Sequence, residues 1–163
     1  MDHATFVSTR SRDERAGRPL IRYEDDAHAW AMEQAELIRR GRFHELDIEN
    51  LADEVEDVAR RERRELISRL DLVYQHLLKW DFQEARRSAS WARTIREQRT
   101  QVGEVLGDNR SLRQQLDELS ETAYRQGRVS ALNETGLPDE AIPGANPYSW
   151  DDAMSRPIAW PEL

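Results

Sequence analysis

The fold is decided by residues 47–80, whose sequence is DIENLADEVEDVARRERRELISRLDLVYQHLLKW. Apolar side chains recur along this stretch at steps of three and four residues, which keeps them on one side of a helix with 3.6 residues per turn. They are Ile48, Leu51, Val55, Val58, Leu66, Leu70, Val73, Leu77 and Trp80. The pattern predicts one long amphipathic helix, with Asp47 as its N-cap, whose apolar side other segments must cover.

One carboxylate interrupts this apolar side. Glu62 stands between Val58 and Leu66, where the spacing requires another apolar residue. A carboxylate there needs a partner or stays protonated, because burying an unpaired charge is costly. Gln34 and Gln98 interrupt the apolar faces of two other expected helices in the same way. These groups either fix the register of the helices, which we favour, or line a ligand or metal pocket.

A first, shorter helix is expected over residues 24–40. Acidic residues stand near its start and Arg39 and Arg40 near its end, which suits the helix dipole at both ends. Gly41 then provides a helix stop. The inner face of this helix is expected to consist of Ala27, Trp30, Ala31, Gln34, Leu37 and Ile38.

Two more helices are expected after a break at residues 81–89. One covers residues 90–106, and the other opens with a capping box of Ser111 and Gln114 and stops at Gly136. Their inward residues are expected to be Trp91, Ile95, Val102 and Val105 in the former, and Leu112, Leu116, Leu119 and Ala123 in the latter.

The two ends of the chain differ from this helical part. Five prolines follow Gly136, so residues 137–163 are expected to form an extended, proline-rich tail that packs on the bundle, with a short helix near residues 149–154. Residues 1–22 are polar and without periodicity, which predicts a loosely held arm. The expected fold class is therefore all-α: four main helices over residues 23–136, one of them long and central.

The lengths of the expected helices are unequal. At a rise of 1.5 Å per residue, the long helix spans about 50 Å and those on either side of it about 25 Å each. Part of the long helix must then be covered by the arm, by the tail or by a second copy of the chain. We therefore expect a homodimer.

Composition limits the classes of function. The formal net charge of −8 disfavours a general nucleic-acid binder, because such proteins present basic surfaces. The absence of cysteine excludes disulfides, thiolate metal sites and cysteine nucleophiles. The sequence has no run of 18 apolar residues, so it predicts no membrane span. Its first 22 residues lack the apolar segment of a secretory signal. The expected location is the cytoplasm.

Motifs for catalysis or metal binding are not apparent. Metal sites in helical bundles use Glu-x-x-His pairs, whereas only Asp25 stands three residues before a histidine, His28. His44 and His76 have no such partner. Nucleophile elbows, phosphate-binding loops and His-Glu-x-x-His are absent as well. We expect no cofactor and lean against an enzyme.

Tryptophan and arginine, which are enriched in interface hot spots, gather over residues 76–99. Arginines beside aromatic rings also suit phosphate or single-stranded nucleic acid, although nearby glutamates can neutralise them in exposed ion pairs. The candidate interaction or pocket residues are Glu62, His76, Lys79, Trp80, Trp91, Arg96 and Gln98.

Several short stretches in a fixed order resemble the bacterial DUF29 family of small helical proteins. They are Tyr23-Glu24-Asp25-Asp26 with Trp30, Gly41-Arg42-Phe43, residues 46–54 (LDIENLADE), His76-Leu77-Leu78-Lys79-Trp80, Ser90-Trp91, residues 94–99 (TIREQR) and Glu134-Thr135-Gly136-Leu137-Pro138. The resemblance covers residues 23–148. It implies a helical fold and a prokaryotic source, and it brings no activity or catalytic residue.

Three functions remain open from the sequence. The one we favour is a non-enzymatic, helical protein–protein interaction module that self-associates. The first alternative is a small-molecule or metal-binding bundle around Glu62 and His76, with hydrolysis as its extreme form. The second is an antitoxin-like or nucleic-acid-associated partner.

Overall fold

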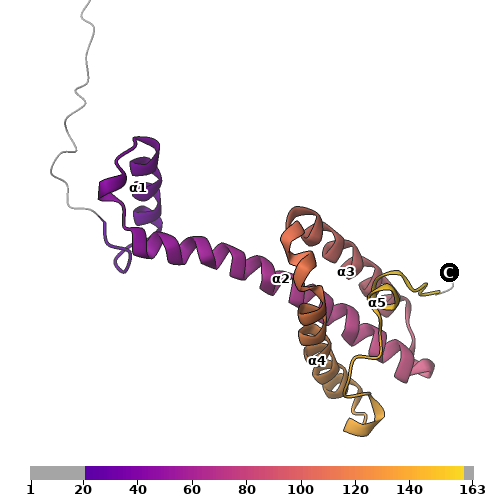
Figure 1. Ribbon diagram of the computed structural model, residues 1–163. Helices are drawn as coiled ribbons and strands as arrows, with labels where there is room; N and C mark the ends of the chain where they lie inside the picture. The colour runs from indigo at the N-terminus through magenta and orange to yellow at the C-terminus, as the bar shows by residue number, and fades with distance from the viewer. Residues whose placement is uncertain (1–20, 160–163) are drawn as a thin grey trace, which may run out of the picture. The chain divides into compact units, whose positions relative to one another are not determined.

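The computed structural model describes residues 21–159 (Figure 1), and all regular structure in this range is helical. The all-α prediction is confirmed. The α-helices are α1 Ala27–Arg39, α2 Ile48–Phe82, α3 Ala89–Asp108, α4 Leu116–Thr135 and α5 Trp150–Ser155. Short 3₁₀ turns are η1 Phe43–Glu45, η2 Glu84–Arg86, η3 Arg110–Gln115 and η4 Asp139–Ala141. The arm expected at residues 1–22 lies, except for its last two residues, outside the described part.

The chain divides into two compact units, residues 1–55 and 56–163. The helix α2 begins in the first unit and continues without interruption into the second. The prediction of one continuous helix over residues 47–80 is therefore confirmed, and so is the break that follows it, where η2 separates α2 from α3.

In the first unit, both ends of α1 are closed by local hydrogen bonds. The side chain of Asp26 accepts a bond from the Ala29 amide at 2.9 Å. At the other end Gly41 takes a φ of +69°, and the amide of Arg42 reaches the Leu37 carbonyl at 2.9 Å. This is a Schellman stop, and glycine suits it because only glycine enters the left-handed region without strain. The predicted role of Gly41 is confirmed.

Polar groups hold α1 against the start of α2. The indole of Trp30 donates to Asp47 Oδ2 at 3.2 Å, and the Asp47 amide donates to Gln34 Oε1 at 2.9 Å. Asp47 Oδ1 in turn accepts from the Asn50 amide at 3.3 Å and so caps α2, as the sequence predicts. Gln34, which is 1% exposed, therefore acts as a connector between the two helices.

The expected inner face of α1 is only partly right. Trp30, Gln34 and Leu37 are buried, but Ala27, Ala31 and Ile38 are exposed. The helix has 13 residues, and Trp30 and Gln34 tie it to Asp47, the residue that precedes α2. Within the described part of this unit, no segment covers the other side chains that were expected on the inner face.

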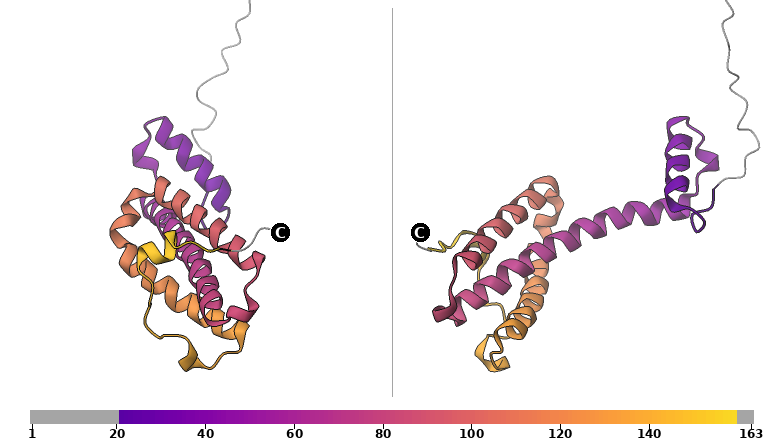
Figure 2. Two further views of the ribbon diagram at one scale, coloured as in Figure 1. Left: turned by 90° about the vertical axis from the view of Figure 1, so that its right-hand side faces the viewer. Right: turned by 180° about the vertical axis from the view of Figure 1, so that it is seen from behind.

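In the second unit, α3 and α4 both lie against the later part of α2 (Figure 2). The core begins at Leu66, because that residue and those after it on the apolar side of α2 are buried while the earlier ones are not. The buried side chains contributed by α2 and α3 include Leu66, Leu70, Val73, Leu77, Ile95 and Val102, and those contributed by α4 include Leu119 and Ala123. Trp91 and Val105 are half-buried against the same core.

The start of α4 differs from the prediction. Ser111 and Gln114 form no capping box; both lie in η3, and α4 begins only at Leu116, without a side-chain cap at Gln115. The tighter 3₁₀ turn still brings Leu112 into the core, where it is 7% exposed. Burial of Leu112 thus outweighs the local capping preference.

Residues 137–159 contribute to the core of the second unit. Ile142, Ala153 and Ile158 are buried. The Tyr124 hydroxyl donates to the Pro143 carbonyl at 2.5 Å, and the guanidinium of Arg99 donates to the carbonyls of the α5 region. The helix α5 opens with a capping box of Ser149 and Asp152, so the short helix expected near residues 149–154 is present.

A single glycine sets how closely α2 and α4 approach. A Cβ placed on Gly127 of α4 would lie 2.7 Å from the Asp71 carbonyl oxygen and 2.9 Å from the Gln75 nitrogen, both of them backbone atoms of α2. Backbone atoms in a packed helix cannot move aside as a flexible side chain can. Any larger residue at Gly127 must therefore push the two helices apart.

Replacing Gly127 with alanine is expected to destabilise the protein by about 1–3 kcal/mol, because overpacking outweighs the gain in helix propensity. The matched control is Gly103→Ala in α3, where a new Cβ meets nothing within 4 Å. That change is expected to stabilise by about 0.5–1 kcal/mol. Urea unfolding followed by circular dichroism measures both, and similar effects of the two changes would show that the α2–α4 contact is looser than described.

Candidate interaction surface

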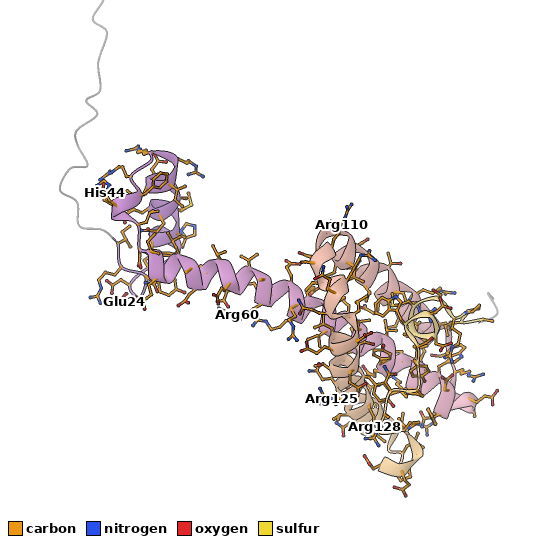
Figure 3. All side chains as sticks on the ribbon, in the orientation of Figure 1. Glu24, His44, Arg60, Arg110, Arg125 and Arg128 are labelled. Carbon is orange, nitrogen blue, oxygen red and sulfur yellow. The ribbon has the colours of Figure 1, made fainter. Side chains whose placement is uncertain are left out.

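The first turns of α2 carry an exposed apolar face. Ile48 is 62% exposed, Val55 69% and Val58 56%. Their spacing places them on one side of the helix, and the exposed Ala52 and Ala59 lie on the same side. Figure 3 shows this part of α2 with its side chains as sticks and Arg60 labelled. In the part of the chain that the structure describes, these apolar side chains before Leu66 are thus exposed.

Each unit has its own contacts with α2. In the first unit, Trp30 of α1 donates to Asp47, which precedes α2, and the hydroxyl of Tyr23, which precedes α1, donates to Glu54 of α2 at 2.6 Å. In the second unit, the core begins at Leu66.

Charge changes sign along the same part of α2. Residues 47–58 hold six carboxylates and no basic residue, whereas residues 60–64 hold four arginines and one glutamate. Arg60 lies at the boundary, where its guanidinium pairs with Glu56 at 3.0 Å and with Asp57 at 2.7 Å. The hydrogen bond from Arg60 lowers the pKa of Asp57, so this carboxylate is charged at neutral pH.

Glu62 finds a partner in Asn109, the residue that follows α3. Its Oε2 accepts a hydrogen bond from Asn109 Nδ2 at 2.8 Å, and the same amide group also donates to the Val105 carbonyl. Gln98 lies apart from it, with Oε1 at 3.4 Å from a guanidinium nitrogen of Arg69. Glu62 therefore ties the end of α3 to α2, as a register-fixing group does, and the two candidates do not form one site.

Lys79 is a buried charge of the second unit, being 7% exposed. Its Nζ pairs with Glu134 Oε2 at 2.5 Å and lies 4.6 Å from the centre of the Trp91 ring. Gln75 Nε2 donates to the other oxygen of Glu134 at 2.7 Å. An ammonium that is held by a carboxylate and an aromatic face is fully compensated, so the cluster joins α2, α3 and α4.

His76 lies next to this cluster. Burial lowers the pKa of its imidazole, and the hydrogen bond to the Leu72 carbonyl partly offsets this. Its Nδ1 is 2.9 Å from that carbonyl. The ring therefore donates from Nδ1 to a carbonyl of its own helix. This nitrogen already makes a structural hydrogen bond.

The remaining candidates differ in accessibility. Trp80 is buried, with the guanidinium of Arg87 at 5.2 Å from its ring centre and bonded to its carbonyl. Trp91 is half-buried beneath Lys79. Arg96 is exposed on α3. Within residues 76–99, Trp80 and Trp91 therefore mainly make contacts inside the unit, and Arg96 is accessible.

The pocket alternative requires Glu62 and His76 to converge. Both lie on α2, 14 residues apart, which is about 21 Å along a helix axis. Within residues 21–159, no three His, Cys, Asp or Glu side chains are grouped so that they could hold a metal ion. The geometry therefore offers no common site for these two residues.

A hollow of about 340 Å³ lies in the first unit, lined in part by Tyr23, Gln34, Glu45 and Asp47. The carboxylates around it already have partners, because Glu45 pairs with Arg42 and Asp47 binds Trp30 and Asn50. These bonds lower the pKa of both carboxylates. The carboxylates that line the hollow thus already form bonds that stabilise the first unit.

Sequence reasoning missed Glu134, the partner of Lys79, because the two residues are 55 positions apart. A signal was present in the spacing of Gln75 and Lys79, which are four residues apart and so share one side of α2. Two buried donors on one side indicate an acceptor on the neighbouring helix. They do not say which helix supplies it.

Comparison with known proteins gives one match. The model of the family described as "Domain of unknown function DUF29" matches residues 22–158. No curated protein matches the chain, and no solved structure matches it. Separately, no helix within residues 21–159 combines the length and apolar content that crossing a membrane requires.

The Lys79–Glu134 pair should respond unequally to loss of its two members. Glu134→Gln leaves a buried ammonium without its counter-charge and is expected to destabilise by about 1–2 kcal/mol at neutral pH. Lys79→Met places an apolar chain of similar length against Trp91, and we expect a smaller cost because Glu134 is half-exposed and can hydrate. Urea unfolding of both variants measures the difference.

The pH dependence of this difference follows from Glu134. Its hydrogen bond from Lys79 lowers the pKa of the folded carboxyl below the ordinary 4.5, so its contribution is present above that value and is lost as the pH falls. The stability gap between the wild-type chain and Glu134→Gln should therefore shrink in acid. A gap that is constant with pH would contradict the ion pair.

Proposed function

The chain belongs to the DUF29 family, a domain of unknown function, and we propose that it is a non-enzymatic, helical protein–protein interaction module that self-associates through α2. The observation that carries this proposal is the exposed apolar face of Ile48, Val55 and Val58. Contiguous apolar surface on a folded protein is a mark of an interaction site, because leaving it in water is costly.

The continuity of α2 supports a binding role for this surface. The exposed residues continue the same apolar side that Leu66, Leu70 and Val73 bury in the second unit. A solvated helix of this length needs no valines or isoleucine on that side, since helix propensity alone favours alanine or charged residues there. Burial in an assembly accounts for β-branched residues at these positions.

The internal use of the polar candidates supports an interaction role over a ligand site. Glu62, His76 and Lys79 each have partners within the chain. The first turns of α2 instead carry Ile48, Val55 and Val58, three exposed apolar side chains on one side of a single helix. The accessible part of residues 76–99, around Arg96, stays a predicted contact for other proteins, and the bacterial cytoplasm stays the predicted setting.

The proposal is tested by placing charges on the exposed face. In the double variant Val55→Glu and Val58→Glu, burial in an interface becomes costly, whereas both positions are exposed in a single chain. The wild-type chain is expected to show twice the chain mass of 19.1 kDa by light scattering, and the variant a mass near 19.1 kDa.

The matched control is Val129→Glu in α4, where the valine is 55% exposed but lies outside the α2 face. This variant should remain a dimer. A wild-type chain that runs as a monomer at micromolar concentration would refute the proposal, as would a dimer that the double variant leaves intact.

A further inference from the structure

One carboxylate of α2 has an oxygen that is buried without a partner. Oδ1 of Asp71 is closed off from solvent, and no group in the described part of the chain donates a hydrogen bond to it. A buried acceptor without a donor is costly, and the cost is higher when the acceptor carries a charge. Folded proteins keep few such groups, so the position of this one is informative.

Asp71 lies where α2 and α4 come closest, and both residues of this contact belong to the second unit. Its backbone carbonyl oxygen would be 2.7 Å from a Cβ on Gly127, and the Gln75 nitrogen, one turn further along α2, would be 2.9 Å from the same Cβ. The two backbones therefore leave no room for a side chain at Gly127. A carboxylate beside so close a contact loses part of the water that would solvate its charge.

The other titratable groups of the segments packed at this contact already have partners. They are Tyr74 on α2, Tyr124, Arg128 and Glu134 on α4, and Tyr148 in the segment that follows α4. Their partners are, in the same order, Ser120, the Pro143 carbonyl, Asp139, Lys79 and Asp81. Burial alone raises the pKa of the Asp71 carboxyl, with no contribution from a neighbouring charge.

We propose that Asp71 makes the contact between α2 and α4 sensitive to protons: the contact is stronger when this carboxyl is neutral and weaker when it is charged. A neutral carboxyl costs less to bury than a carboxylate, because no unpaired charge then has to leave water. Proton uptake at Asp71 therefore stabilises the packed helices. This inference does not depend on the proposed self-association.

The direction of the effect follows from the linkage between proton binding and folding. Because the pKa of Asp71 is raised in the folded chain, its favourable contribution is complete below the ordinary value of 3.8 and is lost as the pH rises through the folded value. Glu134 in α4 behaves in the opposite way, since its lowered pKa gives a contribution that is lost as the pH falls. The same pair of helices thus holds two carboxyls with opposite pH dependences.

The titration of Asp71, followed by NMR of its carboxyl carbon, tests the proposal directly. In the wild-type chain the midpoint should lie above 3.8. In Gly127→Ala, where α2 and α4 must separate, water reaches the carboxyl and the midpoint should fall toward 3.8. The matched control is Gly103→Ala in α3, where a new Cβ meets nothing within 4 Å and the midpoint should equal that of the wild type.

Urea unfolding of neutral variants provides a second test. At neutral pH, Asp71→Asn is expected to unfold at a higher urea concentration than the wild type, whereas Glu134→Gln unfolds at a lower one. Glu121→Gln removes an exposed charge from α4 and should leave the unfolding midpoint unchanged. In acid the advantage of Asp71→Asn should shrink, because the wild-type carboxyl then takes up a proton.

Three results would overturn the proposal. The first is a wild-type titration midpoint of Asp71 at or below 3.8. The second is a raised midpoint that Gly127→Ala leaves in place, because the burial then does not arise from the contact of α2 with α4. The third is an Asp71→Asn chain that is no more stable than the wild type at neutral pH. If Gly127→Ala does not fold, the first and third results decide.

Discussion

The structure depends on the length of α2: its apolar side is buried from Leu66 onward, whereas Ile48, Val55 and Val58 before it are exposed in the part of the chain that the structure describes. The core of the second unit begins at Leu66, and the first unit contacts α2 through Asp47 and Glu54. Burying such side chains completely is worth about 1.5–3 kcal/mol each, which an assembly that covers them would gain.

The polar groups of the interior act mainly as connectors. Gln34 binds the Asp47 amide, Glu62 binds Asn109, and Lys79 is held by Glu134 and Trp91. Each joins one helix to another, and each would be expensive to leave without its partner. Their shared role is to select the arrangement of the helices, since apolar contacts alone tolerate several registers.

Sequence periodicity was sufficient to locate the main helices, and local rules identified some of their ends. Three- and four-residue spacing located α2, and the roles of Gly41 and Asp47 followed from local rules for helix termini. The capping box at Ser111 was wrong, because burial of Leu112 in a 3₁₀ turn decided that segment. Local preferences of about 1 kcal/mol yield when a core contact of greater value is at stake.

The surface was harder to predict than the fold for a physical reason. Periodicity shows which side of a helix is apolar, but not how far along it a neighbour reaches; the exposure of Ile38 and Val58 depends on the lengths and positions of other helices. Contacts between residues distant in sequence, such as Lys79 with Glu134, depend on the same positions. Some candidates that were chosen for their residue type, such as Lys79, are therefore buried.

The most direct measurement is amide hydrogen exchange as a function of protein concentration. The account predicts that exchange over residues 48–59 slows as the concentration rises, because a second copy then covers that face, while exchange over α4 does not change. Exchange over residues 48–59 that is the same at all concentrations, in a range where α4 is also constant, would contradict the account.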